Sequence, residues 1–201
     1  MGKELWSCSK NLLLNMEKDY SLQLKEIILK EKWMMDILRS VRDLGLPDWY
    51  LAAGVVRNTV WDVLHQYTKR TPLNDIDIVY FSSKKNIHDK EVETTLQAKY
   101  PKYSFEVVNQ AFIHKTYSYK KAVSSSCQAI GAFTETPTCV GIRLEKNNSL
   151  TICAPHGLQD LFSLQVMPSS QIPEMLSSYR KRMKQKQWKK TWPKLQIRSI
   201  S

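Results

Sequence analysis

One short run constrains the fold of this chain more than any other. From Asp75 to Ile78, in the run from Asn74 to Tyr80, aspartate and isoleucine alternate, and a period of two is typical of a β-strand with one buried face. A strand over 75–81 places Asp75 and Asp77 together on one face. The opposite, core-facing side then carries Ile76, Ile78 and Tyr80. The chain must therefore bury one side of a sheet and leave two carboxylates on the other.

Helical periodicity flanks this strand on both sides. Apolar residues recur at helical spacing from Leu22 to Leu44, where Gly45 and Pro47 end the helix. A second helix is expected to open at Asn58 or Thr59. Its inner face would consist of Val60, Trp61, Leu64 and Tyr67. The remaining helices are expected over 89–100, over 158–164 and from Pro173 onward.

Extended patterns complete a mixed α/β fold. Strands are expected over 49–53, 103–108, 138–145 and 149–154, the last two as a hairpin around Asn147 and Asn148. The order α-β-α-β-α-β, then β-β-α-α, predicts a mixed sheet with helices packed against it, an α/β (α+β) fold in a single domain. Residues 1–20 are expected to form a loosely attached arm and 21–201 the domain, with 175–201 as its basic tail.

Composition favours a globular protein of the cytoplasm. The chain has 201 residues, of which 42% are apolar and 24% charged, as is usual for one domain of this size. Its apolar runs are too short for a membrane span or a signal peptide. The four cysteines, Cys8, Cys127, Cys139 and Cys153, show no metal-ligand spacing and are interpreted as reduced, mostly buried residues.

The net charge of +11 is concentrated near the C-terminal end. No acidic residue follows Glu174, whereas nine lysines and arginines do. With Trp188 and Trp192 among them, these residues could bind RNA or another phosphate-rich partner and offer stacking surfaces to its bases. The other interpretation is a solvated helix whose tryptophans dock on the core.

The two aspartates of the central strand suggest a divalent metal. Carboxylates so close on one face repel each other unless a cation lies between them, and oxygen ligands favour Mg²⁺ or Mn²⁺. The D-x-D pattern alone is common, and a solvated polar face also explains it.

A glycine turn upstream makes the metal interpretation more specific. Gly54 lies at a strand-to-helix turn, where the lack of a Cβ lets phosphate oxygens approach the N–H groups that open the helix. A phosphate cradle and a pair of metal-holding carboxylates are the two halves of a nucleoside triphosphate site. The alternatives are a simple tight turn at Gly54 and a surface ion pair at Arg57.

Together the two segments resemble a known enzyme superfamily. The run 53–58 (AGVVRN) and then 75–78 (DIDI) is similar to the G-G-x-V-R-D turn and D-x-D strand in the head domain of CCA-adding enzymes and bacterial poly(A) polymerases. Those enzymes belong to the DNA polymerase β-like nucleotidyltransferase superfamily. More closely, the chain from about Trp33 to Leu195 resembles a family of small stand-alone bacterial nucleotidyltransferase-like proteins. Its hallmarks stand here at 53–62, 71–77, 108–111, 155–162 and 189–193.

The resemblance implies an enzyme with a particular reaction and particular site residues. The reaction moves a nucleoside monophosphate from a triphosphate to a hydroxyl and releases pyrophosphate, with Mg²⁺ or Mn²⁺ as cofactor. The implied catalytic and metal-binding residues are Asp75, Asp77 and, as a third carboxylate on a neighbouring strand, Glu106. The nucleotide-binding residues are expected to be Gly54, Val55, Arg57, Asn58 and Arg143. Arg143 also fits a cross-strand ion pair, and Glu106 also fits an ordinary exposed strand position.

Departures from the pattern limit what the resemblance implies. Ala53 replaces the first glycine of the turn and Asn58 replaces its aspartate, and no arginine-rich motif is legible after the third strand. Because only about forty residues follow Leu161, the helical neck and body that select the base and grip tRNA are not expected, nor is CCA addition. The acceptor (RNA, protein or small molecule) is left open. The alternative hypothesis is a catalytically silent protein of the same fold that binds nucleotide or RNA.

Overall fold

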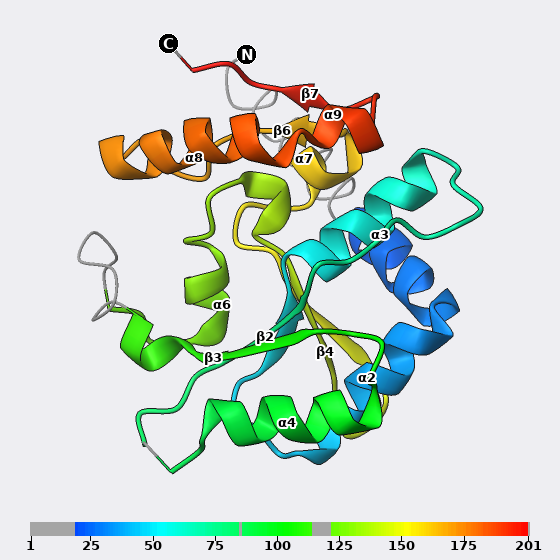
Figure 1. The fold of residues 1–201 in the computed structure, drawn as a ribbon, viewed down its shortest axis with the longest axis vertical. Helices are drawn as coiled ribbons and strands as arrows, with labels where there is room; N and C mark the ends of the chain where they lie inside the picture. The colour runs from blue at the N-terminus through cyan, green and yellow to red at the C-terminus, as the bar shows by residue number, and fades with distance from the viewer. Residues whose placement is uncertain (1–18, 85, 114–121, 201) are drawn as a thin grey trace, which may run out of the picture.

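A five-stranded sheet with helices on both faces forms the centre of the molecule (Figure 1), in a computed structural model that describes residues 19–84, 86–113 and 122–200. In spatial order the strands are β3 (Phe105–Asn109), β2 (Ile76–Tyr80), β1 (Tyr50–Ala52), β4 (Gly141–Leu144) and β5 (Leu150–Cys153). The pair β2–β3 is parallel and the other pairs are antiparallel. The predicted mixed sheet is confirmed.

The helices follow the predicted order with small changes in their bounds. They are α2 (Lys32–Asp43), α3 (Gly54–Leu64), α4 (Asp89–Lys99), α6 (Ser126–Ile130), α7 (Gln159–Phe162), α8 (Pro173–Lys186) and α9 (Trp188–Thr191), with 3-10 turns η1 (Gln110–Phe112) and η2 (Thr136–Thr138). Residues 19–30 are also helical. The helix predicted over 22–44 is therefore interrupted at Glu31, whose carboxylate accepts a hydrogen bond from Trp33 Nε1 (2.6 Å).

The two faces of the sheet are buried to different extents. On one face, Ile76, Ile78 and Tyr80 of β2 join the main core, which extends from Leu24 to Leu195. On the other face, a small apolar cluster around Tyr50 and Ala52 packs against Ile130 of α6. Because α6 covers only part of this second face, the side chains beside the cluster border open space rather than core.

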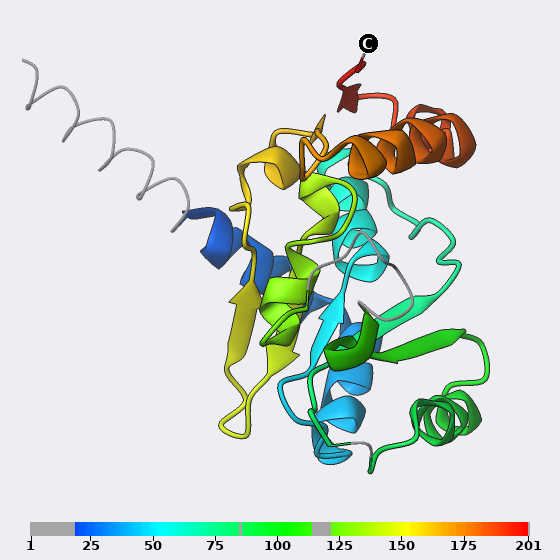
Figure 2. The same ribbon diagram turned by 90° about the vertical axis from the view of Figure 1, so that its left-hand side faces the viewer.

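The basic C-terminal segment closes one end of the molecule. Helix α8 lies at that end in both ribbon views (Figures 1 and 2). A short parallel pair, β6 (Gln165–Val166) and β7 (Gln196–Ile197), holds the chain beyond it. The sequence patterns did not indicate this pair, which consists of two residues on each strand.

The tryptophans of this segment are core residues. Trp188 and Trp192 are buried, and their rings make edge contacts with Trp61 of α3 at centroid distances of 5.4 and 5.1 Å. Of the two interpretations of the basic tail, the docking one is confirmed for the tryptophans. They do not form an exposed stacking surface for bases.

The predicted start of the second helix is wrong by about one turn. Helix α3 begins at Gly54, directly after β1. Thr59 does not cap a helix, because its hydroxyl donates to the carbonyl of Val55 (2.8 Å) one turn earlier. Tyr67, expected on the inner face, lies beyond the helix and is 39% exposed.

The prediction that the cysteines are reduced is wrong for two of them. Cys127 of α6 and Cys153 of β5 form a disulfide, with their Cα atoms 5.6 Å apart. Residues 26 positions apart meet here only because α6 folds back onto the sheet, so spacing along the chain gives no sign of the pair. Cys139 is free and buried, whereas Cys8 and most of the predicted arm lie outside the described residues. Within the described ranges, no helix has the length and apolar character needed to cross a membrane.

Candidate active site

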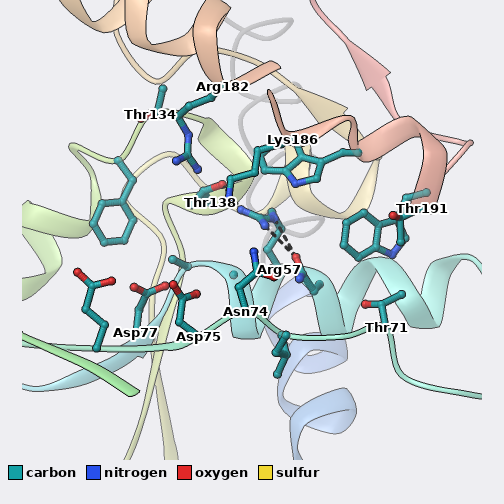
Figure 3. A pocket seen from close by; sticks show the side chains of 18 of the residues that line it. Arg57, Thr71, Asn74, Asp75, Asp77, Thr134, Thr138, Arg182, Lys186 and Thr191 are labelled. Atoms are coloured by element: carbon teal, nitrogen blue, oxygen red, sulfur yellow. Dashed lines mark hydrogen bonds between the residues drawn. The ribbon is translucent and has the colours of Figure 1, made fainter. Parts of the chain in front are cut away.

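Three carboxylates on β2 and β3 form the floor of a cavity of about 520 Å³. Asp75 directly precedes β2, and Asp77 lies opposite Glu106 in the parallel register of the two strands. All three side chains line the cavity, and Asp75 and Asp77 point into it side by side (Figure 3). The strand alternation predicted from the sequence therefore brings the expected acids together.

The turn from β1 to α3 forms another wall of this cavity. Its residues Ala53 and Gly54 both line the cavity. Ala53 has φ 59° and ψ −122°, a backbone conformation that favours glycine. A Cβ at Gly54 would meet only the Arg57 guanidinium, 3.8 Å away, so a side chain there would fill cavity space without a clash. Helical hydrogen bonding starts with Arg57 N–H to Ala53 O (3.0 Å). The N–H groups of the preceding residues are therefore available at the helix start to bind an anion.

Arg57 is a buried cation at the back of the cavity, only 6% exposed. Its guanidinium donates to Thr138 Oγ1 (2.7 Å) and Asn58 Oδ1 (2.8 Å) and lies 4.3 Å from the ring centroid of Trp188. Burial lowers the pKa of Arg57 to about 10, and the charge of Glu135 opposes this shift. The guanidinium therefore remains charged at neutral pH.

Helix α8 supplies the roof. Arg182 and Lys186, one helical turn apart, line the cavity from above, opposite Asp75 and Asp77 (Figure 3). Arg182 Nε donates to Glu135 Oε1 at 2.6 Å, and Glu135 is completely buried. A buried carboxylate thus fixes the guanidinium of Arg182 beside the cavity. The sequence patterns assign neither residue of this ion pair to the site.

A second buried carboxylate ties the C-terminal segment to the loop before β2. Asp62 of α3 accepts hydrogen bonds from Trp192 Nε1 (2.7 Å) and from the backbone N–H of Thr71 (2.9 Å). Thr71 and Trp192 both line the cavity. Three segments that carry the family hallmarks are therefore joined at one side chain, and this contact fixes the side wall of the site.

The carboxylates on the floor destabilise one another when charged. Burial, and then the charges of Asp75 and Glu106, raise the pKa of Asp77 to about 7 from its usual 3.8. Arg57 and Arg182 act in the opposite direction but do not cancel the shift. The site therefore holds an excess of negative charge at its floor that a bound cation would relieve.

The donor set of the floor fits a hard divalent cation. Within the described part of the chain, no cage of three or more His, Cys, Asp or Glu side chains is placed so that it could hold a metal ion. Mg²⁺ seldom needs such a cage, because it is usually bound by one or two carboxylates together with substrate phosphates and water. The pair Asp75 and Asp77, with Glu106 beside it, is a donor set of this kind.

Two of the residues expected to bind nucleotide do not present side chains to the cavity. Arg143 lies on β4 and is held by Glu145 (2.9 Å) and Asp48 (3.5 Å), so its predicted role at a triphosphate is not supported. The ion-pair alternative explains it. The Val55 side chain is fully buried in the core, which leaves only its backbone N–H for a ligand. Gly54, Arg57 and Asn58 all line the cavity, and their role in nucleotide binding stays a prediction.

Helix α8 could have been assigned to the site only in part from the sequence. Met175, Arg182 and Lys186 line the cavity, and the interval of four between the two cations places them on one helix face. That spacing predicts that Arg182 and Lys186 share a face of the helix, but it does not predict that this face packs over the cavity. Nothing near Glu135 in the sequence predicts that its partner is 47 residues away.

Comparison with known proteins agrees with this geometry. A nucleotidyltransferase family matches residues 39–197 of the chain, so the chain belongs to this nucleotidyltransferase family. A solution NMR structure described as revealing a CCA-adding enzyme head domain is 30% identical in sequence, with a TM-score of 0.77. The match covers 89% of this chain and 96% of that one. No curated protein sequence shows a significant match.

More distant structures share the fold over part of their length. A CCA-adding enzyme in complex with CTP is 12% identical, with a TM-score of 0.58, over 88% of this chain and 43% of that one. The CCA-adding enzyme of Thermotoga maritima in complex with tRNA is 13% identical, with a TM-score of 0.57, over 88% and 42% of the two chains. The chain thus matches less than half the length of these enzymes. At such identities the likeness concerns the fold alone.

Proposed function

We propose that the protein is a metal-dependent nucleotidyltransferase that transfers a nucleoside monophosphate from a nucleoside triphosphate to a hydroxyl group and releases pyrophosphate. Family membership supports nucleotidyl transfer in general. The observation that carries the finer proposal is that three carboxylates and a glycine turn at a helix start line one cavity. These are the two parts that a metal-bound triphosphate requires.

Each wall of the cavity has a role in this proposal. The triphosphate lies between the N-terminus of α3, where Gly54 leaves room for its oxygens, and the cations Arg57, Arg182 and Lys186. Asp75 and Asp77 hold Mg²⁺ or Mn²⁺, and Glu106 faces the side from which the acceptor approaches. When bound, the divalent ions polarise the α-phosphate and stabilise the departing pyrophosphate.

The atoms of the reaction balance within this site. The acceptor hydroxyl oxygen forms a bond to the α-phosphorus, and the bond from that phosphorus to the α,β-bridging oxygen breaks. Pyrophosphate leaves with the electron pair of the broken bond. The hydroxyl proton passes to a carboxylate oxygen of the floor, for which Glu106, an exposed residue at the cavity, is the proposed acceptor.

The test is a transfer assay with each ribonucleoside triphosphate labelled at the α-phosphate, in Mg²⁺ or Mn²⁺. The intact protein is expected to release pyrophosphate and label an acceptor, and Asp77→Ala to abolish both. Asp43→Asn, at an exposed position of α2, is the control and should behave like the intact protein. If nucleotide still binds to Asp77→Ala with unchanged affinity and neither protein transfers label, the silent binding protein is the correct alternative.

A further inference from the structure

A second cavity of about 390 Å³ adjoins the first at the carboxylates. Both are lined by Asp77, Glu106, Phe133, Thr134 and Arg182. Beyond this shared wall, the second cavity continues along the same sheet face to Val79 and Val108, which are register partners on β2 and β3. The carboxylates of Asp77 and Glu106 therefore lie where the two cavities meet; these cavities are called the first and the second chamber below. Asp75 and the Gly54 turn line only the first chamber.

This inference rests on the function proposed above. The two chambers separate the nucleotidyl donor, the triphosphate, from the hydroxyl acceptor. In phosphoryl-type transfer the attacking and leaving oxygens lie roughly in line on opposite sides of the phosphorus. The first chamber carries the helix start and the cations for the triphosphate. A hydroxyl that attacks over the carboxylates must then come from the second chamber.

The lining of the second chamber indicates what kind of molecule carries that hydroxyl. Val79, Val108, Ile113 and Phe133 form an apolar surface. Ser178, Lys181 and Arg182 of α8 also line the chamber. Arg182 is already bound to the buried Glu135, whereas Lys181 is exposed. The chamber therefore offers an apolar surface next to the carboxylates and an ammonium group at its rim.

The size of the chamber and the scarcity of exposed aromatic side chains favour a small molecule over an RNA strand. Its volume lies at the lower end of the range for small-molecule pockets. Proteins that bind single-stranded RNA usually stack its bases on aromatic side chains, yet both tryptophans of the basic tail are buried. Among the described residues, the exposed large hydrophobic side chains include one aromatic, Tyr67, which lines neither chamber.

We propose that the acceptor is a small alcohol with an apolar body and an acidic group, bound in the second chamber with the acidic group at Lys181. The apolar body lies on Val79 and Val108, and the hydroxyl reaches the carboxylates at the junction. The product is a phosphodiester between this alcohol and the nucleoside monophosphate.

The experiment compares charge reversals on two exposed lysines. Lys181→Glu changes the rim of the second chamber, and Lys190→Glu changes a lysine of α9 that lines neither chamber. Each protein is incubated with α-labelled triphosphates, Mn²⁺ and one of two acceptor preparations. One is a cellular extract below 1 kDa enriched in anions by ion exchange, and the other is total RNA.

The expected result is labelled product in the small anionic extract. Lys181→Glu should lower the rate at limiting extract concentration at least tenfold and leave the affinity for triphosphate within twofold, whereas Lys190→Glu should change neither. Label on RNA, with similar losses in both variants and a steep salt dependence, would overturn this proposal while upholding nucleotidyl transfer. Label in the small-molecule fraction that is insensitive to Lys181→Glu would also overturn it. Absence of labelled product with either preparation would instead count against the proposed function itself.

Discussion

Replacing Asp77 with asparagine is expected to stabilise the protein while removing its activity. The pKa of Asp77 is raised to about 7 in the folded protein, against 3.8 as the usual value. A difference of about three pH units, at about 1.4 kcal/mol per unit, sets a ceiling of about 4 kcal/mol on the cost of holding this carboxylate charged. Because Asp77 retains partial contact with water, the expected gain is about half of that, ~2 kcal/mol at pH 8.

The sign and the pH window follow from the direction of the shift. A carboxyl whose pKa is raised in the folded state binds its proton more tightly there than in the unfolded chain. Stability of the intact protein therefore falls as the pH rises from about 4 to about 7. Asparagine carries no charge, so Asp77→Asn should match the intact protein near pH 4 and exceed it progressively up to pH 8.

Thermal unfolding in the absence of divalent metal measures this effect. For a chain of this size, ~2 kcal/mol corresponds to a rise in Tm of roughly 4–8 °C. Asp43→Asn is the control, because Asp43 is exposed and its ion pair with Arg42 lies on the surface; its Tm should stay within about 2 °C. Millimolar Mg²⁺ should stabilise the intact protein and not Asp77→Asn. A gain of equal size at pH 4 and pH 8, or no gain at either, would refute the electrostatic reasoning.

Three further changes test other parts of the site. Gly54→Ala should leave Tm within about 2 °C, because its Cβ meets no atom closer than 3.8 Å, yet weaken triphosphate binding about tenfold by calorimetry, since the methyl group occupies the phosphate cradle. Glu135→Gln should lower the free energy of unfolding by about 2 kcal/mol in urea titrations, because it removes the buried negative charge that faces the Arg182 guanidinium; unchanged stability would contradict this. Reduction of the Cys127–Cys153 disulfide, which spans 26 residues, should cost about 3.5 kcal/mol by loop entropy and lower the Tm, whereas an insensitive Tm would contradict it.

The sequence predicted strand β2 well because its pattern is local. Alternation over 75–78 places aspartate and isoleucine on opposite faces without reference to the rest of the chain, and Ile76, Ile78 and Tyr80 are all fully buried. The outward direction of Glu106 was also predicted from local alternation, because its neighbours Phe105 and Val107 are apolar and, in the structure, buried. Its position opposite Asp77 then follows from the register of the strands.

The errors concern residues whose roles depend on distant partners. Arg143 carries the charge expected of a phosphate ligand, but the fold places Asp48 within 3.5 Å of it, 95 positions earlier in the sequence. Thr59 has the chemistry of a helix cap, but the preceding strand ends so close to Gly54 that the helix has already begun. In each case the residue type was suited to the predicted role, but contacts with residues that are close in space give the side chain a different role.

Which side chains share a face, and how much charge the chain carries, can be predicted from the amino-acid sequence, because both depend only on the periodicity of strands and helices and on composition. What lies opposite those faces depends on the packing of the folded chain. Segments that are remote along the chain meet at four features of the fold. These are the packing of α8 over the acidic side chains, the pairing of Arg182 with Glu135, the disulfide and the second chamber. Such contacts depend on how whole helices and strands pack together. Residues throughout the core contribute to the free energy of that packing, so no single segment of the sequence predicts it.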